Sequence, residues 1–265
     1  MELNESAASI QAIAFLVVVG LFIGILGALA VGHYLGRLNI STETETARTR
    51  LTVVEAAVFG LMGLMFAFIF SGAASRYELR RQLTVDEANV IGTAYLRLDL
   101  LQAQAQPALR EKFRRYLEAR IAVWELLPDI EASSRQAAVA ASLQQDIWAS
   151  AIAALEASPP QATIMVVPAL NQMFDITTSR EIAALTHTPL PVLLMLVVLG
   201  LACSLLAGYV MAGIKTRQVI VHTITFALIM TTTVYVIIDL DYPRFGLIRL
   251  DFADKGLIDL LARLK

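Results

Sequence analysis

AAVFGLMGLMFAFIFSGAAS, residues 56–75, is the stretch that decides the fold, because it runs for a bilayer's width without a charged residue. A bilayer core about 30 Å thick requires about 20 helical residues. A Lys, Arg or Asp at the centre of such a helix costs about 2.5–3.5 kcal/mol. RYELRR, residues 76–81, follows at once. The chain therefore changes here from a segment that suits lipid to one that suits water.

Three other apolar runs have the same character, so four membrane spans are predicted, at about 6–36, 53–75, 189–214 and 218–238. The whole chain is 57% apolar and 17% charged, against about 45–50% and 25% in soluble domains. A cleaved signal peptide is not expected, because residues 1–5 are acidic rather than basic. Small residues recur at four-residue spacing and are interpreted as packing surfaces: Gly20, Gly24, Gly32, Gly36, Gly200, Ser204 and Gly208.

Between the second and third spans lies a segment with the charge balance of a soluble protein. Residues 76–188 hold 11 Lys and Arg and 13 Asp and Glu. Helical spacing of apolar residues predicts helices over 107–128, 130–155 and 162–185. Pro168 is expected to kink or split the last of these. No alternating strand pattern is present in the sequence, so this segment is predicted to be a helical bundle.

The predicted fold class is all-α, with four transmembrane helices and a helical-bundle soluble domain inserted between the second and third. The expected division of the chain is as follows: residues 1–75 hold the first two spans, 76–188 the soluble domain, 189–238 the last two spans, and 239–265 a C-terminal tail with a short amphipathic helix.

Motifs for catalysis and cofactor binding are absent from the sequence. It has no phosphate-binding loop, dinucleotide fingerprint, zinc-protease motif or nucleophile elbow. The one cysteine, Cys203, excludes an intramolecular disulfide. Because 21 Lys and Arg are balanced by 23 Asp and Glu, a nucleic-acid partner is not expected either. We therefore expect no enzyme, no catalytic residue, no cofactor and no metal site.

Charged clusters at the ends of the spans are the more informative feature. In a four-span chain they lie on one side of the membrane, and we interpret them as a layer that couples the spans to the soluble domain. Interfacial anchoring, a helix stop and a solvated helix face are the alternatives. The residues are Arg76, Tyr77, Arg80, Arg81, Asp86, Glu87, Asn171, Asp175, Arg180, Asp239, Asp241 and Arg244.

The second span carries two rows of residues at four-residue spacing. One row is Gly60, Leu64 and Phe68, and the other is Met62, Phe66 and Phe70. Bulky apolar residues in such a row could constrict a pore, but periodicity alone favours lipid contact for either row.

Three motifs resemble those of bacterial bestrophin-like membrane proteins, relatives of the bestrophin channels. They are FIFSGAASRYELRRQLTVDEANVIGTA at 68–94, NQMFDITTSR at 171–180 and YVIIDLDYPRFGLIR at 235–249. The resemblance implies a homo-oligomer, pentameric in bestrophins, whose second span lines a pore for small inorganic ions. It places the constriction candidates at Gly60, Leu64 and Phe68, although the glycine departs from the bestrophin pattern.

The resemblance also implies an orientation that charge counting does not decide. Seven basic residues lie near the spans on one side of the membrane and five on the other, and this difference is too small to assign the orientation. With bestrophins as the guide, the protein is expected in the bacterial inner membrane, with its termini and residues 76–188 in the cytoplasm. The lipid bilayer and further copies of the chain are the expected partners.

The leading hypothesis is thus a bestrophin-like ion channel or channel-like protein. A membrane-anchored sensor or scaffold, whose helical domain binds a ligand or partner, is the alternative. A transporter or intramembrane enzyme is a third, supported only by the sparse polar groups Ser71, Ser204 and Thr231–Thr233.

Overall fold

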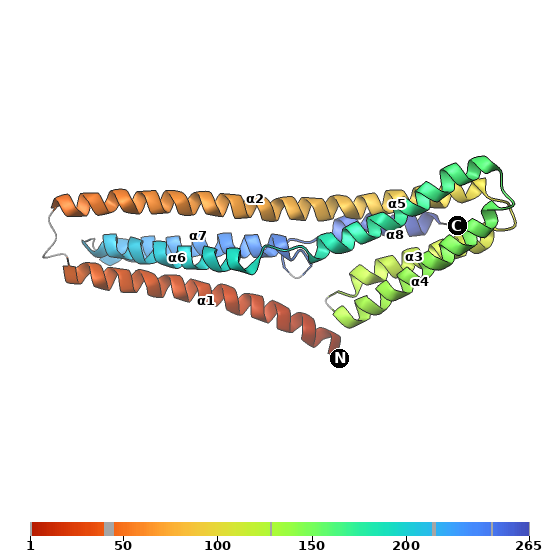
Figure 1. The fold of residues 1–265 in the computed structure, drawn as a ribbon. Coiled ribbons are helices and arrows are strands. Elements are labelled where there is room, and N and C mark those ends of the chain that lie inside the picture. The colour runs from red at the N-terminus through yellow and green to blue at the C-terminus, as the bar shows by residue number, and fades with distance from the viewer. Residues whose placement is uncertain (1, 40–44, 128, 214–215, 245, 265) are drawn as a thin grey trace. The chain divides into compact units, whose positions relative to one another are not determined.

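A computed structural model describes residues 2–39, 45–127, 129–213, 216–244 and 246–264. All regular elements in these ranges are helices, which confirms the predicted all-α class (Figure 1). The α-helices are α1 (Glu2–Asn39), α2 (Glu45–Arg97), α3 (Gln106–Glu125), α4 (Ile130–Leu155), α5 (Pro160–Leu185), α6 (Leu190–Val210), α7 (Thr216–Asp241) and α8 (Asp251–Arg263). Two short 3₁₀ turns, η1 (Leu98–Leu100) and η2 (Met211–Gly213), follow α2 and α6.

The chain divides into two compact units. The membrane unit comprises Ser9–Ser75 and His187–Tyr242, and the helical unit comprises Met1–Ala8, Arg76–Thr186 and Pro243–Lys265. Residues 243, 244 and 246–264 belong to the predicted tail 239–265 and group with the helical unit. Ile214, the expected end of the third span, lies outside the described residues.

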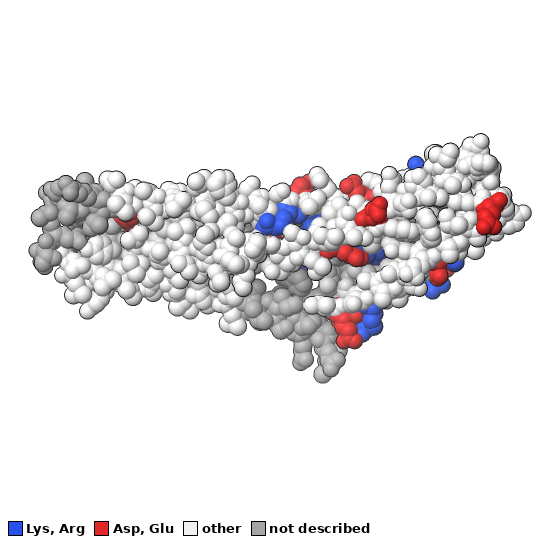
Figure 2. Space-filling model, viewed as in Figure 1, with Lys and Arg blue, Asp and Glu red and all other residues white. Residues whose placement is uncertain are grey.

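Four helical stretches are long and apolar enough to cross a membrane, as predicted. They lie within Phe15–Asn39, Thr52–Leu100, Pro160–Val210 and Val219–Asp241. Only 17–28% of each apolar window is buried within the chain, so most of this surface must contact lipid or another protein. On the face shown in Figure 2, charged side chains gather over the helical unit, and the spans are almost free of them.

Glycines bring the backbones of α1 and α6 together in the membrane unit. A Cβ atom on Gly32 would lie 1.9 Å from the Leu205 carbonyl oxygen, and one on Gly208 would lie 2.1 Å from that of Leu29. No side chain fits at such a distance, so glycine is required at both positions. This confirms the packing surface predicted for Gly32 and Gly208, whereas Gly20 has no described neighbour within 4 Å of such an atom.

The core of the helical unit is built from the apolar rows of α2, α3, α4 and α5, with Leu257 of α8. Most large apolar side chains of α3 are buried, with Phe113 and Leu117 fully enclosed. Helix α4 has the bounds predicted for it, and its first turn is capped by the Asp129 side chain, which accepts a hydrogen bond from the Ala132 amide at 3.0 Å.

Of the kink or split predicted at Pro168, the split is absent, because α5 runs uninterrupted through this residue. Proline removes one helical hydrogen bond, to the carbonyl of Ile164. Pro168 and Ile164 both lie on the exposed side of α5, where water can satisfy that carbonyl. The neighbouring carbonyl of Met165 accepts a hydrogen bond from Arg97 at 2.7 Å. The exposed position of the proline thus allows the helix to continue.

Replacing Gly208 by Ala is expected to lower the apparent melting temperature of the detergent-purified protein. The new Cβ would meet the Leu29 carbonyl, and overpacking of this kind costs about 1–3 kcal/mol. Scanning fluorimetry measures the shift. Gly20→Ala is the matched control, because it adds the same atom where no described residue is near. Equal melting temperatures for the two variants would contradict the close approach of α1 and α6.

Candidate functional site

The buried side of α2 in the helical unit carries Arg80, Thr84 and Glu87, which are spaced by four and three residues. Arg80 donates hydrogen bonds from Nε to the Ala183 carbonyl at 3.0 Å and from Nη2 to the Thr186 carbonyl at 2.6 Å. These carbonyls lie at the C-terminal end of α5, which is the negative end of the helix dipole. Arg80 therefore caps α5.

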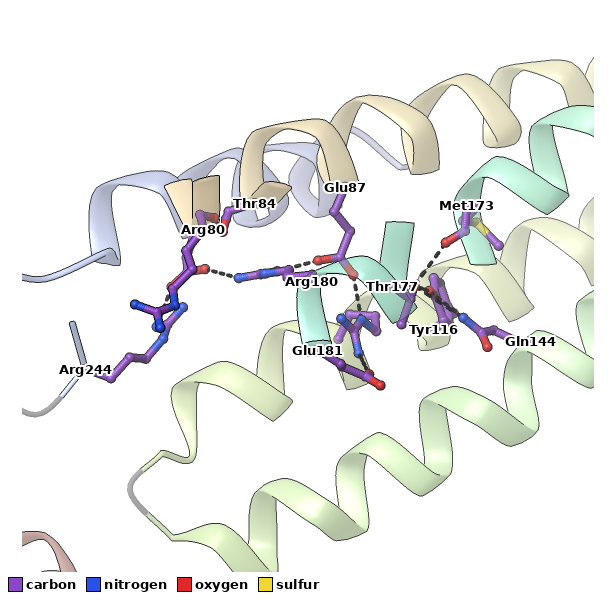
Figure 3. Close-up of polar contacts among 12 residues, drawn as sticks. Arg80, Thr84, Glu87, Tyr116, Gln144, Met173, Thr177, Arg180, Glu181 and Arg244 are labelled. Atoms are coloured by element: carbon purple, nitrogen blue, oxygen red, sulfur yellow. Dashed lines mark hydrogen bonds and ion pairs between the residues drawn. The ribbon is translucent and has the colours of Figure 1, made fainter. Parts of the chain in front are cut away.

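Glu87 lies between two buried guanidinium groups (Figure 3). Its Oε1 accepts from Nε of Arg120 at 2.6 Å, and its Oε2 accepts from Nη1 of Arg180. The side chains of Glu87 and Arg120 are 0% exposed, and that of Arg180 is 4% exposed. One carboxylate thus joins α2, α3 and α5. At the edge of the site, Glu181 accepts from Nη1 of Arg120 at 2.9 Å.

The network continues to the C-terminal part of the helical unit. Nη2 of Arg180 donates to Asp254 on α8 at 2.7 Å, and the same carboxylate pairs with Nη1 of Arg244 at 2.6 Å. The indole ring of Trp124 lies among the three guanidinium groups, with its centroid 4.2 Å from Arg180, 5.2 Å from Arg244 and 5.9 Å from Arg120. Arginine is attracted to the face of an indole ring at such distances.

We name this group the arginine cluster: Arg120, Arg180 and Arg244, with Trp124, Glu87 and Asp254. Burial lowers the pKa of Arg180 below its usual value, although Glu87 and Asp254 oppose the shift. Burial acts in the same direction on Arg120 and is the largest single effect there, but attraction to Glu87, Tyr116 and Glu181 and the hydrogen bond to Glu87 together outweigh it, so the pKa of Arg120 is raised. Among the described residues, Nη2 of Arg120 has no hydrogen-bond partner. The cluster therefore holds more donors than its carboxylates satisfy.

A second polar cluster lies in the membrane unit, where α7 ends and α6 begins. The buried carboxylate of Asp241 accepts hydrogen bonds from the backbone amide of Thr188, at 3.0 Å, and from its hydroxyl. His187 stacks on Tyr242 with 4.3 Å between ring centroids, and its Nδ1 lies 3.1 Å from the Asp241 carbonyl oxygen. Asp241 thus holds the chain at Thr188, two residues before α6 begins at Leu190. Asp239 is buried as well.

The remaining residues of the predicted coupling layer lie outside these clusters. Arg76 is half-buried, and the Tyr77 hydroxyl donates to the Arg249 carbonyl at 3.3 Å. Arg81 pairs with Glu78 on the surface at 2.7 Å. Like Arg81, the predicted residues Asp86, Asn171 and Asp175 are exposed.

The two rows predicted on the second span differ in burial. Leu64 and Phe68 are 51% and 64% exposed, whereas Met62 and Phe66 are each 8% exposed. Gly60 is exposed too, and no described atom lies within 4 Å of a Cβ built there. Met62 and Phe66 pack inside the membrane unit, although Phe70 of the same row is 43% exposed, and the row of Leu64 and Phe68 is left uncovered by this chain.

Arg120, Trp124 and Asp254 were not singled out from the sequence as site residues. A signal was present for Arg120, because it lies three residues after Leu117 and four before Trp124, in the apolar row of α3. A basic residue within an apolar row is buried only when it is paired. Its partner Glu87 lies 33 residues earlier in the chain, and sequence spacing does not show that contact.

Known proteins share this fold. A family model described as Bestrophin-like domain matches residues 19–251. A crystal structure of a bacterial bestrophin homolog from Klebsiella pneumoniae with one mutation is similar at a TM-score of 0.61 and 13% identity, over 92% of this chain and 98% of that one. The crystal structure of the Klebsiella pneumoniae homolog obtained by Zn-SAD phasing is similar at a TM-score of 0.61 and 13% identity, over 93% of this chain and 98% of that one. No curated protein sequence matches the chain.

Replacing Glu87 by Gln is expected to destabilise the helical unit by about 3–5 kcal/mol, because it leaves two buried guanidinium groups without their carboxylate. Chemical denaturation followed by tryptophan fluorescence measures the loss, since Trp124 lies in the cluster. Glu131→Gln is the matched control, because it removes the same charge from an exposed pair with Arg135, which is worth less than about 1 kcal/mol. Similar losses in both variants would contradict the central position of Glu87.

Proposed function

Because the chain belongs to the bestrophin-like family and is a multi-pass membrane protein, we propose that it works as a homo-oligomeric, channel-like protein for small inorganic ions. The second span, α2, lines the pore, and Gly60, Leu64 and Phe68 form an apolar constriction. The observation that supports this proposal is the difference in burial between the two rows of α2. The row that packs within the chain is distinct from the row that faces outward.

The outward row has the properties of a hydrophobic gate. Leu64 and Phe68 are large and apolar, and copies of them around a symmetry axis would leave a narrow passage without hydrogen-bonding groups. Water leaves such a passage readily, and ions then cannot cross it. Conduction therefore depends on wetting of the constriction, which a small change in the spacing of the helices would control.

The arginine cluster and Asp241 are the parts that we assign to coupling. Glu87 and Arg80 both lie on α2, the helix that carries the constriction residues, and each fixes α5 through side-chain contacts. A shift of α5 would therefore act directly on the pore-lining helix. We further propose the bacterial inner membrane as the location, with the termini and residues 76–188 on the cytoplasmic side.

A second candidate function is a membrane-anchored sensor or scaffold. It is favoured by an open pocket of about 350 Å³ within the helical unit. Tyr95, Gln106, Arg110, Arg114 and Leu264 are among its lining residues. Arg110 is already engaged by Asp99 and by the Tyr95 hydroxyl, so a ligand would have to compete with these partners. This is why we rank the channel first.

Reconstituted in liposomes, the wild-type protein is expected to pass small ions, and Phe68→Ala to pass them faster and with less selectivity. Removing the ring widens and wets the constriction, and Leu64→Ala should act in the same direction. Fluorescence-based flux assays with several ions measure both effects. Phe15→Ala is the matched control, because Phe15 is a similarly exposed phenylalanine of α1, at 67%. Absence of flux from the intact wild-type oligomer would overturn the proposal.

The subunit number separates the two candidate functions. We expect the detergent-purified protein to be a closed oligomer, pentameric as in bestrophins, with α2 nearest the symmetry axis. Native mass spectrometry gives the number of copies, and cryo-electron microscopy identifies the helix at the axis. A monomer or a dimer without a central passage would instead favour the sensor or scaffold.

A further inference from the structure

The exposed row of α2 extends beyond the constriction candidates. Each residue of a straight α-helix is rotated by about 100° from the one before it. By this geometry, eight residues between 64 and 93 lie within about 40° of a single line that runs along the surface of α2. All of them are exposed. We name this set the outer row: Leu64, Phe68, Ser71, Ser75, Gln82, Asp86, Asn89 and Thr93. Because α2 is one uninterrupted helix from Glu45 to Arg97, the row changes from apolar to polar on the same face.

Asp86 is the one charged member of the outer row. Its carboxylate makes no hydrogen bond or ion pair with any part of the chain that the structure describes. The acid next to it in sequence, Glu87, points away from the outer row and is fully buried between two arginines. In the part of α2 that belongs to the helical unit, the buried Arg80 and Glu87 are held by partners within the chain, whereas Asp86 on the outer side is exposed.

We infer that Asp86 determines which ions the protein favours, by contributing one carboxylate from each copy to a ring that attracts cations toward the pore. This inference rests on the proposed function, since the ring exists only when copies of α2 surround an axis. Passages lined by one sign of charge raise the local concentration of the opposite ion, and rings of Asp or Glu serve this purpose in cation channels.

The other charges of α2 beside the outer row do not cancel this effect. Glu78 and Arg81 lie beside it and form a neutral pair with each other. Arg97, at the far end of α2, is half-buried and donates to the Met165 carbonyl at 2.7 Å. Arg97 has no carboxylate partner among the described residues. If Asp86 loses its charge, Arg97 is therefore the nearest charge on this side of α2 that no acid neutralises. Removal of Asp86 should therefore shift the preference away from cations.

The distance between Asp86 and Phe68 predicts that the effect of the carboxylate ring on conductance depends on salt concentration. Eighteen residues separate them, which is about 27 Å along a helix. The screening length is about 10 Å at 0.1 M ionic strength and about 30 Å at 0.01 M. The carboxylate ring therefore reaches the constriction electrostatically only in dilute salt. We expect its effect on cation conductance to be several-fold at low salt and to diminish strongly at 0.1 M and above.

The test is the reversal potential of the reconstituted full-length protein in a KCl gradient, with conductance recorded in dilute and concentrated salt. Wild type should reverse toward the K⁺ equilibrium potential. Asp86→Asn should reverse closer to zero and lose several-fold conductance in dilute salt only. Asp146→Asn is the control, because it removes an exposed acid of the same unit from α4, and it should behave as wild type.

A second measurement uses the thiol chemistry of the same position. In a Cys203→Ala background, Asp86→Cys is modified with a cationic methanethiosulfonate reagent, which reverses the original charge. Cation current should fall on modification, whereas Asp146→Cys should be unaffected. Conduction that is anion-selective in wild type, or unchanged in both Asp86 variants, would overturn the inference and leave the proposed channel intact. Absence of conduction in wild type would instead overturn the channel itself.

Discussion

The buried carboxylate of Glu87 is the contact on which the helical unit depends. It is shared between Arg120 on α3 and Arg180 on α5, and all three side chains are almost completely enclosed. Guanidinium groups cannot be held in an apolar interior without an opposite charge. The contact therefore fixes the rotation of three helices at once, because a turn of any of them by one residue would remove a charge from its partner. The neighbouring Arg80 adds a second restraint by capping α5.

The two sides of α2, the helix that carries Glu87, make different contacts. Its inner side carries Arg80, Thr84 and Glu87, which are satisfied within the chain. Its outer side carries the constriction candidates and a run of polar residues that nothing in the described chain covers. An isolated copy would leave this long face without function. In the proposed oligomer the inner side holds the subunit together and the outer side faces the ions.

Local sequence signals were sufficient for the elements of the fold. The apolar runs located the four spans, and the apolar spacing located α4 to the residue. The motifs at 68–94, 171–180 and 235–249 indicated the family that the match to residues 19–251 confirms. The contacts of the arginine cluster could not be predicted from the sequence in this way. Arg120 and Asp254 join Glu87 and Arg180 through contacts between residues far apart in the chain, and spacing along one helix contains no information on them. The continuity of α5 at Pro168 likewise depended on exposure, which the sequence does not state.

The glycines of the membrane unit provide an independent argument for the oligomer. Gly32 and Gly208 are needed because another backbone lies against them within the chain. Gly60 and Gly63 on α2 are different, because no described atom lies within 4 Å of a Cβ built on either. Glycine in a helix interior costs about 1 kcal/mol relative to alanine, so two open glycines one turn apart are unfavourable for the single chain. They are explained if α2 meets other copies of itself closely at this level, as small residues allow between helices in lipid. The packing of one chain accounts for the first pair of glycines, and the proposed oligomer would account for the second.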